Sequence, residues 1–313
     1  FKQKTAYEML RSLVGSEMCI RDSVLRAIAG LDTALWDMRG KIEDKPVVSL
    51  IGGSPGKLRV YGSSMKRDIT PIEEAERFKK LEASLGINAF KFRIGAECGR
   101  GEDEWPGRSE DIIKVMNKSL DPKTAKLVDA NSCFSSKRAI EIGYLLEDND
   151  VSHFEEPCPY WEPEQTLEVT NALKIDVTGG EQDCEFRIWK DMIDRKIVNI
   201  VQPDIMYMGG LTRSLKIAKM AEEQNLTCTP HAANLSLVTI CTMHFLKAIP
   251  NAGKYLELSI EGEDYYPWQQ NLFMNDPFLV KDGEVEISDS PGWGVEINPD
   301  WLNNADYDIS EIE

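Results

Sequence analysis

Three short acidic segments in the middle of the chain carry the side chains best suited to metal chemistry. Asp129, Glu155 and Glu181 each follow a short run with strand character and precede a turn signal. Equal intervals separate them, since 155 − 129 = 26 and 181 − 155 = 26, and one strand, one helix and two loops fit such an interval. A repeated strand–helix unit would therefore bring three carboxylates to one point, which suits a hard cation such as Mg²⁺.

Lys91 and Arg93 are two cations that lie two residues apart in a strand pattern spanning 88–95. Because side chains alternate along a strand, both point from the same face. If the strands close into a barrel, unpaired charge in its interior would be costly, so we expect both side chains at the rim, facing carboxylates. A strand face exposed to solvent is the alternative.

The chain has three histidines, and His231 is the strongest candidate for an acid or base. It follows a strand pattern at 226–230, and Asp204 ends the preceding strand pattern at an equivalent height. The carboxylate could therefore accept a hydrogen bond from the imidazole and hold one tautomer. We expect His153, within a strand, and His244, on a helix, to be structural.

The elements that must position these residues follow a repeating order. Strand patterns occur at 58–62 and 88–95, ahead of Asp129, Glu155 and Glu181, and at 198–204, 226–230 and 255–258; helical patterns occur at 70–85, 112–116, 140–146, 165–173, 187–194 and 215–224. Thr70 is expected to cap the first of these helices. Eight strand candidates alternating with helices predict a parallel α/β barrel, in which catalytic groups lie at the carboxyl ends of the strands.

The segments on either side of this repeat show different patterns. Apolar residues recur at helical spacing from Val24 to Met38, so we expect a helix with one buried face that Gly40 ends. After Ser259 the sequence is rich in aromatic residues and turns, with a hairpin predicted at 280–287. We expect this tail to lie beside the barrel.

Residues 1–23 lack the pattern of a secretory signal, and a short amphipathic helix is predicted at 7–14. The stretch 14–23 resembles the peptide that arises when sequencing-adapter DNA is translated. We therefore expect that the true amino terminus is missing or replaced. A natural helix and turn is the alternative.

Composition and charge narrow the classes of partner. The chain has 313 residues, of which 42% are hydrophobic and 28% charged, as in an ordinary soluble protein, and no apolar run approaches the roughly 20 residues of a membrane span. A formal net charge of −17 argues against a nucleic-acid partner. The seven scattered cysteines form no Cys-x-x-Cys pair, which suits reduced thiols in a cytoplasm.

The order of the motifs resembles that of the enolase superfamily, in particular the mandelate racemase-like branch of its mandelate racemase/muconate lactonizing enzyme family. The motifs that carry the resemblance are Lys91-x-Arg93, Asp129-x-Asn131, Glu155-Glu156-Pro157, Gly180-Glu181, Pro203-Asp204 with Gly209-Gly210, His231 and Glu257. The helix at 27–41 and the tail motif at 291–296 are also similar. The resemblance therefore covers about residues 24–300.

The resemblance implies an α/β fold, a (β/α)7β modified TIM barrel with an amino-terminal α+β cap that we expect to be largely missing here. On this basis we expect a remnant of the cap at 1–23, the barrel at 24–258, and at 259–313 a carboxyl-terminal segment that packs on barrel and cap. Family members are commonly oligomers, which leaves a homo-oligomer open.

The resemblance also implies a role for each candidate residue. Asp129, Glu155 and Glu181 would bind Mg²⁺, which in turn would hold the carboxylate of a small-molecule substrate. Lys91 would neutralise the same carboxylate, Asp204 and His231 would form a catalytic dyad, and Glu257 would form a hydrogen bond with the substrate. We expect Arg93 and Asn131 to bind substrate as well.

Arg93 departs from much of the family, where this position is a lysine that acts as a base. A guanidinium stays protonated because its pKa exceeds about 12, so racemisation by two bases is disfavoured. We therefore predict a hydro-lyase that uses His231 to remove water from a sugar acid, an aldonate or aldarate, and gives a 2-keto-3-deoxy acid. Lys91 as the base, an epimerase, and an inactive fragment that lacks its cap are the alternatives.

Overall fold

The computed structural model describes residues 6–99 and 101–304, with side chains described from Val24 onward. The ends of the predicted domains at 1–5 and 305–313 lie outside the described residues. No helix in the described part of the chain is long and apolar enough to cross a membrane.

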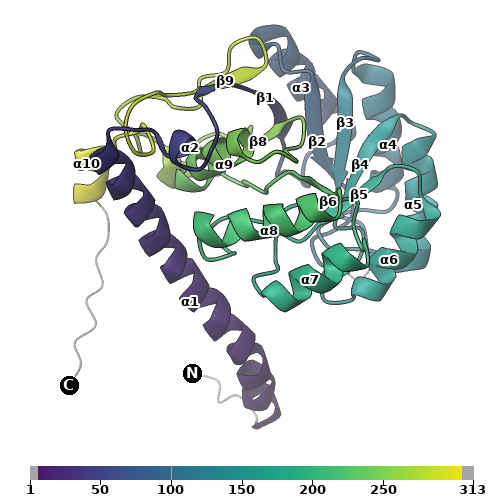
Figure 1. The fold of residues 1–313 in the computed structure, drawn as a ribbon. Coiled ribbons are helices and arrows are strands. Elements are labelled where there is room, and N and C mark those ends of the chain that lie inside the picture. Colours follow the sequence, from purple (N-terminus) through teal and green to yellow (C-terminus); the bar gives the residue numbers. More distant parts are fainter. Residues whose placement is uncertain (1–5, 100, 305–313) are drawn as a thin grey trace.

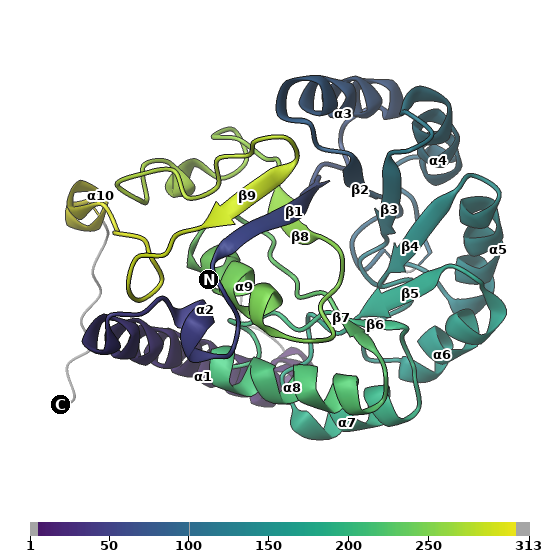
Figure 2. The same ribbon diagram turned by 45° about the horizontal axis from the view of Figure 1, so that its top comes forward.

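Eight parallel strands form one curled sheet at the centre of the molecule (Figure 2). In chain order they are β1 (Gly56–Ser63), β2 (Ala89–Arg93), β3 (Ala125–Asp129), β4 (Val151–Glu155), β5 (Asp176–Gly179), β6 (Ile200–Val201), β7 (Thr227–Cys228) and β8 (Leu256–Ser259). Hydrogen bonding links them in the order β7-β6-β5-β4-β3-β2-β1-β8. A parallel bridge from Cys228, in β7, to Ala252, just ahead of β8, joins the two outer strands, so the sheet is TIM-barrel-like.

One helix connects each strand to the next and lies on the outside of the sheet (Figure 2). These helices are α3 (Pro71–Leu85), α4 (Arg108–Ser119), α5 (Ser136–Glu147), α6 (Pro163–Ala172), α7 (Phe186–Asp194), α8 (Leu211–Glu223) and α9 (Leu237–Ala248). Thr70 caps α3 as predicted: its side chain accepts a hydrogen bond from the backbone of Glu73, whose own side chain bonds back. The predicted alternation of strands and helices is confirmed.

Alternation along β2 separates the hydrophobic core from the polar interior. Phe90 and Phe92 are fully buried, and Phe90 stacks on Phe78 of α3 with ring centroids 4.5 Å apart. Lys91, between them, points from the opposite face of the strand and is also fully buried. The same pattern on the neighbouring strands gives a dry layer between sheet and helices and a charged layer inside the sheet.

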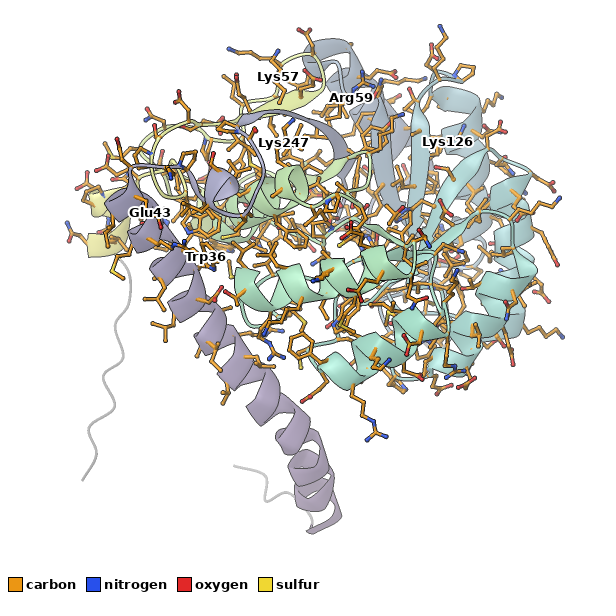
Figure 3. The ribbon with its side chains drawn as sticks, in the orientation of Figure 1. Trp36, Glu43, Lys57, Arg59, Lys126 and Lys247 are labelled. Atoms are coloured by element: carbon orange, nitrogen blue, oxygen red, sulfur yellow. The ribbon has the colours of Figure 1, made fainter. Side chains whose placement is uncertain are left out.

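The long first helix differs from the prediction. α1 (Ala6–Glu43) continues through the predicted helix at 7–14 and through Gly40, so Gly40 does not end it. A Cβ at Gly40 would lie only 2.6 Å from the Cα of Gly292, so glycine is required there because the tail passes close by. Trp36 faces the barrel and its Nε1 donates a hydrogen bond to Thr212 of α8 at 2.9 Å (Figure 3).

The expected buried face of α1 is exposed in this chain. Its apolar residues recur at alternating intervals of four and three residues and are between 42% and 75% exposed: Val24, Ile28, Leu31, Leu35, Met38 and Ile42. Figure 1 shows α1 running past α8 and extending beyond the barrel, so this apolar stripe has no covering layer among the described residues.

The tail closes back onto the start of the barrel. β9 (Glu284–Ile287) pairs antiparallel with β1, and a turn at Asp282 and Gly283 precedes it. The predicted hairpin is therefore only partly formed, because the main partner of β9 is β1 rather than residues 280–283. The remaining short elements are α2 (Val47–Leu50), η1 (Pro267–Gln269) and α10 (Pro299–Asn303).

His244 of α9 connects three parts of the fold. Its Nδ1 accepts a hydrogen bond from the backbone N–H of Val48 in α2 at 2.9 Å, and its Nε2 lies 3.2 Å from the carbonyl of Trp293 in the tail. Only the neutral Nε2–H tautomer satisfies both partners. Burial lowers the pKa of His244 from 6.5 to about 4, although the bond to Trp293 opposes the shift.

We expect His244 to make the fold sensitive to acid. Because its pKa is lower in the folded than in the unfolded chain, the stabilisation is present above pH 6.5 and is lost as the pH falls towards 4. The loss between pH 7 and pH 5 is about 2 kcal/mol of unfolding free energy. His244→Gln should be less stable at pH 7 but lose correspondingly less on acidification, as measured by urea unfolding. Parallel pH dependences in both proteins would rule this out.

Candidate active site

The strand register brings the predicted site residues to one end of the sheet. Arg93 lies beside Asp129, and Asp129 lies beside Glu155, as partners on β2, β3 and β4. Asp204 and His231 form a parallel bridge just beyond β6 and β7. Glu181 follows β5 by two residues and Glu257 lies within β8. The site residues predicted from the sequence, other than the half-buried Asn131, are buried.

Lys91 occupies the centre of this group. Its Nζ lies 2.8 Å from Glu155, 2.7 Å from Glu257 and 3.7 Å from Asp129. Burial alone would lower the pKa of Lys91, but Glu155 and Glu257 outweigh it and raise the pKa above its ordinary value. Burial likewise opposes the effect of Lys91 on Glu257, whose pKa falls to about 2. Lys91 therefore holds two carboxylates ionised in a dry interior.

Arg93 connects the same group to the loops. Its Nη1 forms an ion pair with Asp129 and donates a hydrogen bond to Asn131 Oδ1 at 2.8 Å. Its Nε donates to the carbonyl of Ser64 at 2.8 Å. The cation is thus paired and buried at the strand ends, as predicted, and is not on a solvent-exposed face.

His231 and Asp204 are arranged as the sequence predicted. His231 Nδ1 lies 2.8 Å from Asp204 Oδ2, which fixes the proton on Nδ1 and leaves Nε2 directed towards Glu181, 3.3 Å away. Burial would lower the pKa of His231, but Glu181 and the bond to Asp204 raise it well above its ordinary value. Because Asp204 holds the proton on Nδ1, Nε2 is the position at which the ring can gain or lose a proton.

Glu155, Glu156 and Glu181 crowd negative charge into a buried space. Burial and then repulsion from Glu181 and Glu155 raise the pKa of Glu156 well above its ordinary value. Glu156 Oε1 is buried and forms no hydrogen bond, and Glu181 Oε2, also without a hydrogen bond, lies 3.3 Å from His231 Nε2. Buried carboxylate oxygens without hydrogen bonds, in a set of hard oxygen donors, fit a divalent cation.

The described residues nevertheless do not form a preassembled cage. Among them, no group of three histidine, cysteine, aspartate or glutamate side chains is arranged to hold a metal ion. Protein cations contact each of the predicted ligands instead: Arg93 contacts Asp129, Lys91 contacts Glu155, and His231 contacts Glu181. The metal role of the three carboxylates therefore remains a prediction.

The structure adds residues that the sequence argument did not include. His153 Nε2, expected to be structural, lies 3.2 Å from Glu155 Oε2 and 2.9 Å from Thr178 Oγ1. Gln202 donates to Glu155 Oε2 at 2.9 Å, and Ser63 donates to Glu257 Oε1 at 2.7 Å. The sequence spacing could have identified two of these residues. His153 lies two residues before Glu155, and Gln202 lies two residues before Asp204, so each shares a strand face with a predicted site residue.

Two family models match the chain. The model described as "Enolase C-terminal domain-like" matches residues 73–301, and the amino-terminal domain model of mandelate racemase/muconate lactonizing enzymes matches residues 3–52. Together they account for most of the sequence.

Curated relatives include two sugar-acid dehydratases. The arabinonate dehydratase of Saccharolobus solfataricus is 26% identical over 88% of this chain and 71% of its own length. The L-talarate/galactarate dehydratase of Salmonella typhimurium is 27% identical over 88% of this chain and 64% of its own length.

Solved structures give the same family. A Roseobacter denitrificans protein, assigned only provisionally as a racemase, is 55% identical with a TM-score of 0.91 over 99% of this chain and 86% of its own. A mandelate racemase/muconate lactonizing protein of Paracoccus denitrificans, complexed with magnesium, is 28% identical with a TM-score of 0.79 over 87% of this chain and 73% of its own. The chain therefore belongs to the mandelate racemase-like branch of the enolase superfamily.

Proposed function

We propose that the protein is a Mg²⁺-dependent dehydratase that converts a sugar acid, an aldonate or aldarate, into a 2-keto-3-deoxy acid. The observation that carries this proposal is that Asp204 and His231 form a hydrogen-bonded pair, whereas position 93, at which much of the family has a lysine base, holds an arginine that pairs with Asp129. The dehydratase names of curated relatives support the reaction class.

Asp129, Glu155 and Glu181 would hold the cation. Bound Mg²⁺ supplies a positive charge that attracts the substrate carboxylate and favours loss of the neighbouring proton. Lys91 adds a fixed ammonium in the same space, and Glu257, anchored by Ser63, offers an acceptor for a substrate hydroxyl. These groups are buried, so their charges act with little screening by water.

His231 would carry the proton through both halves of the reaction. Its Nε2 accepts the proton from the carbon next to the carboxylate, and the electron pair left behind moves into that carboxylate. The same Nε2 then returns the proton to the hydroxyl on the next carbon, so that the C–O bond breaks and water leaves. The resulting enol tautomerises to the 2-keto-3-deoxy acid. Asp204 keeps the proton on Nδ1 throughout.

A racemase or epimerase is the second candidate, and the Roseobacter relative is the observation in its favour. Inversion through two bases needs a proton donor on the opposite face of the substrate. Arg93 is paired with Asp129 and bound to Ser64, and a guanidinium stays protonated, so it is unsuited to act as the second acid–base group. This arrangement favours elimination over inversion.

We expect divalent metal to stabilise the folded protein as well as activate it. Dialysis against EDTA should abolish turnover, and millimolar Mg²⁺ should restore it and raise the thermal midpoint, because a ligand that binds only the folded state stabilises it. Glu181→Gln should lose most of that rise. Glu222→Gln, an exposed glutamate on α8, is the matched control. An unchanged rise in Glu181→Gln would remove Glu181 from the ligand set.

His231→Asn should lower kcat by about 10²–10⁴-fold, because it removes the proposed proton carrier. The Mg²⁺-dependent rise in thermal midpoint should persist, which would separate loss of catalysis from loss of metal or fold. The measurement is formation of keto acid from a panel of aldonates and aldarates. Substantial activity in His231→Asn would instead point to Lys91 as the base.

Reaction in D₂O should distinguish elimination from inversion. A dehydratase gives keto acid with deuterium at C3, since solvent supplies that hydrogen when the enol tautomerises. An epimerase returns substrate with deuterium at the α-carbon and releases no keto acid. No turnover by this chain and none by a version that carries the cap of a relative would contradict the proposed dehydratase, whereas turnover by the capped version alone would support the inactive-fragment alternative.

A further inference from the structure

The loop after β1, residues 64–70, is held firmly against the site. The backbone N–H of Met65 donates to Glu261 Oε1 at 2.7 Å, and the carbonyl of Ser64 accepts from Arg93 at 2.8 Å. Lys66 forms an ion pair of 2.8 Å with Asp264 in the tail. These contacts hold the backbone from which the next side chain, Arg67, extends.

Arg67 is a half-buried cation whose partners are neutral. Its Nε donates to the carbonyl of Gly95 at 3.2 Å, and its Nη2 donates to Asn131 Oδ1. None of the carboxylates that the structure describes lies within 4.0 Å of its guanidinium nitrogens. Burial, followed by repulsion from Arg93, lowers the pKa of Arg67 to about 10, so it remains charged at neutral pH.

Two guanidinium groups converge on one amide oxygen. Arg93 donates to the same Asn131 Oδ1 at 2.8 Å, but its charge is matched by Asp129. Arg67 forms no such ion pair among the described residues, although the exposed Glu97 and Glu104 are near enough to act in favour of its charged form. Its guanidinium can therefore still pair with an anion.

The position of Arg67 indicates which part of a substrate would supply that anion. Asn131 donates its backbone N–H to Asp129 Oδ1 at 2.7 Å, so Arg67 lies next to the proposed metal ligands. Lys91 lies within β2, whereas Arg67 follows the end of β1 by four residues and is further towards the loops. A substrate whose first carboxylate is held near Lys91 would direct its far end towards Arg67.

We propose that Arg67 binds a second, distal carboxylate and that the preferred substrates are aldarates, which are sugar diacids, rather than aldonates. This inference rests on the proposed function and narrows its substrate class. A planar guanidinium matches a carboxylate with two parallel hydrogen bonds, whereas the terminal hydroxyl of an aldonate carries no charge. The alternative is that Arg67 only fastens the loops through Gly95 and Asn131.

The experiment compares acids that differ only at the distal carbon. Galactarate is paired with galactonate, and glucarate with gluconate, and kcat/KM is measured for each with Mg²⁺ present. The wild-type protein should favour the diacid of a pair by at least about tenfold, because one charge-assisted bidentate pair is worth roughly that factor or more. Arg67→Gln should lower the diacid-to-monoacid ratio about 10–100-fold, and Arg67→Lys should lower it less.

Arg59→Gln is the matched control. Arg59 is a largely exposed arginine on β1, away from the loop that carries Arg67 (Figure 3), and its Nε lies 3.9 Å from Glu284. Its substitution should leave the ratio unchanged. The thermal midpoint of each variant shows whether it is folded.

Binding separates this inference from the proposed function. Calorimetry with His231→Asn, in Mg²⁺, should show tighter binding of galactarate than of galactonate, and the double variant with Arg67→Gln should lose the difference. If the protein binds the diacid selectively but the wild type shows no turnover, the proposed dehydratase is contradicted and the proposed role of Arg67 is supported. Turnover or binding without a diacid preference, or equal losses for both acids in Arg67→Gln, would overturn the Arg67 proposal. A folded protein that neither binds nor converts either acid contradicts both.

Discussion

Buried negative charge is the constraint on which the rest of the site depends. The carboxylates gathered at the strand ends are Asp129, Glu155, Glu156, Glu181, Asp204 and Glu257, all of them buried. Lys91 and Arg93 are the permanent cations that contact them, and His231 is a third group that can carry charge. Carboxylates in a dry interior are stable only when they are paired or protonated. The arrangement of the strands therefore has to deliver cations and carboxylates to the same level.

The register of the parallel sheet places the charged groups in two sets, one on β2 to β4 and the other beyond β6 and β7. On β2, β3 and β4, Arg93, Asp129 and Glu155 lie side by side, so that Arg93 pairs with Asp129 while Lys91, from the same strand as Arg93, pairs with Glu155. On the far side, the bridge between Asp204 and His231 sets a histidine whose tautomer is fixed. Glu181 belongs to the second set: its Oε2 lies 3.3 Å from His231 Nε2 and forms no hydrogen bond. A divalent cation would relieve the remaining repulsion on this side.

The outer layer determines which molecule can use this chemistry. The loop after β1 is tied to β2 through Arg93 and to the tail through Lys66 and Asp264, so Arg67 is presented from a braced segment. The site thus combines an inner region that neutralises one carboxylate with an outer cation, Arg67, that forms no ion pair among the described residues. Inner groups common to a family set the reaction class, while loop residues such as Arg67 can set the substrate.

In helix α1 the local sequence pattern predicts the helix but not its surroundings in the folded protein. Its apolar periodicity correctly predicted a helix, but not which face would be buried, because most of the apolar stripe from Val24 to Ile42 is exposed. The sequence pattern also predicted that Gly40 ends the helix. Glycine is instead required at position 40 because Gly292 approaches it closely. Both differences arise because burial and close contact depend on segments distant in sequence.

The sequence by itself determined the alternation of strands and helices, the placement of Asp129, Glu155 and Glu181 at strand ends, and the family. These follow from local periodicity and from motif order, which are properties of neighbouring residues. Only the tertiary structure decided that Lys91 lies between Glu155 and Glu257, that Gln202 donates to Glu155, and that Arg67 contacts Asn131. Those contacts depend on the register between strands and on the path of loops, and no local pattern encodes either.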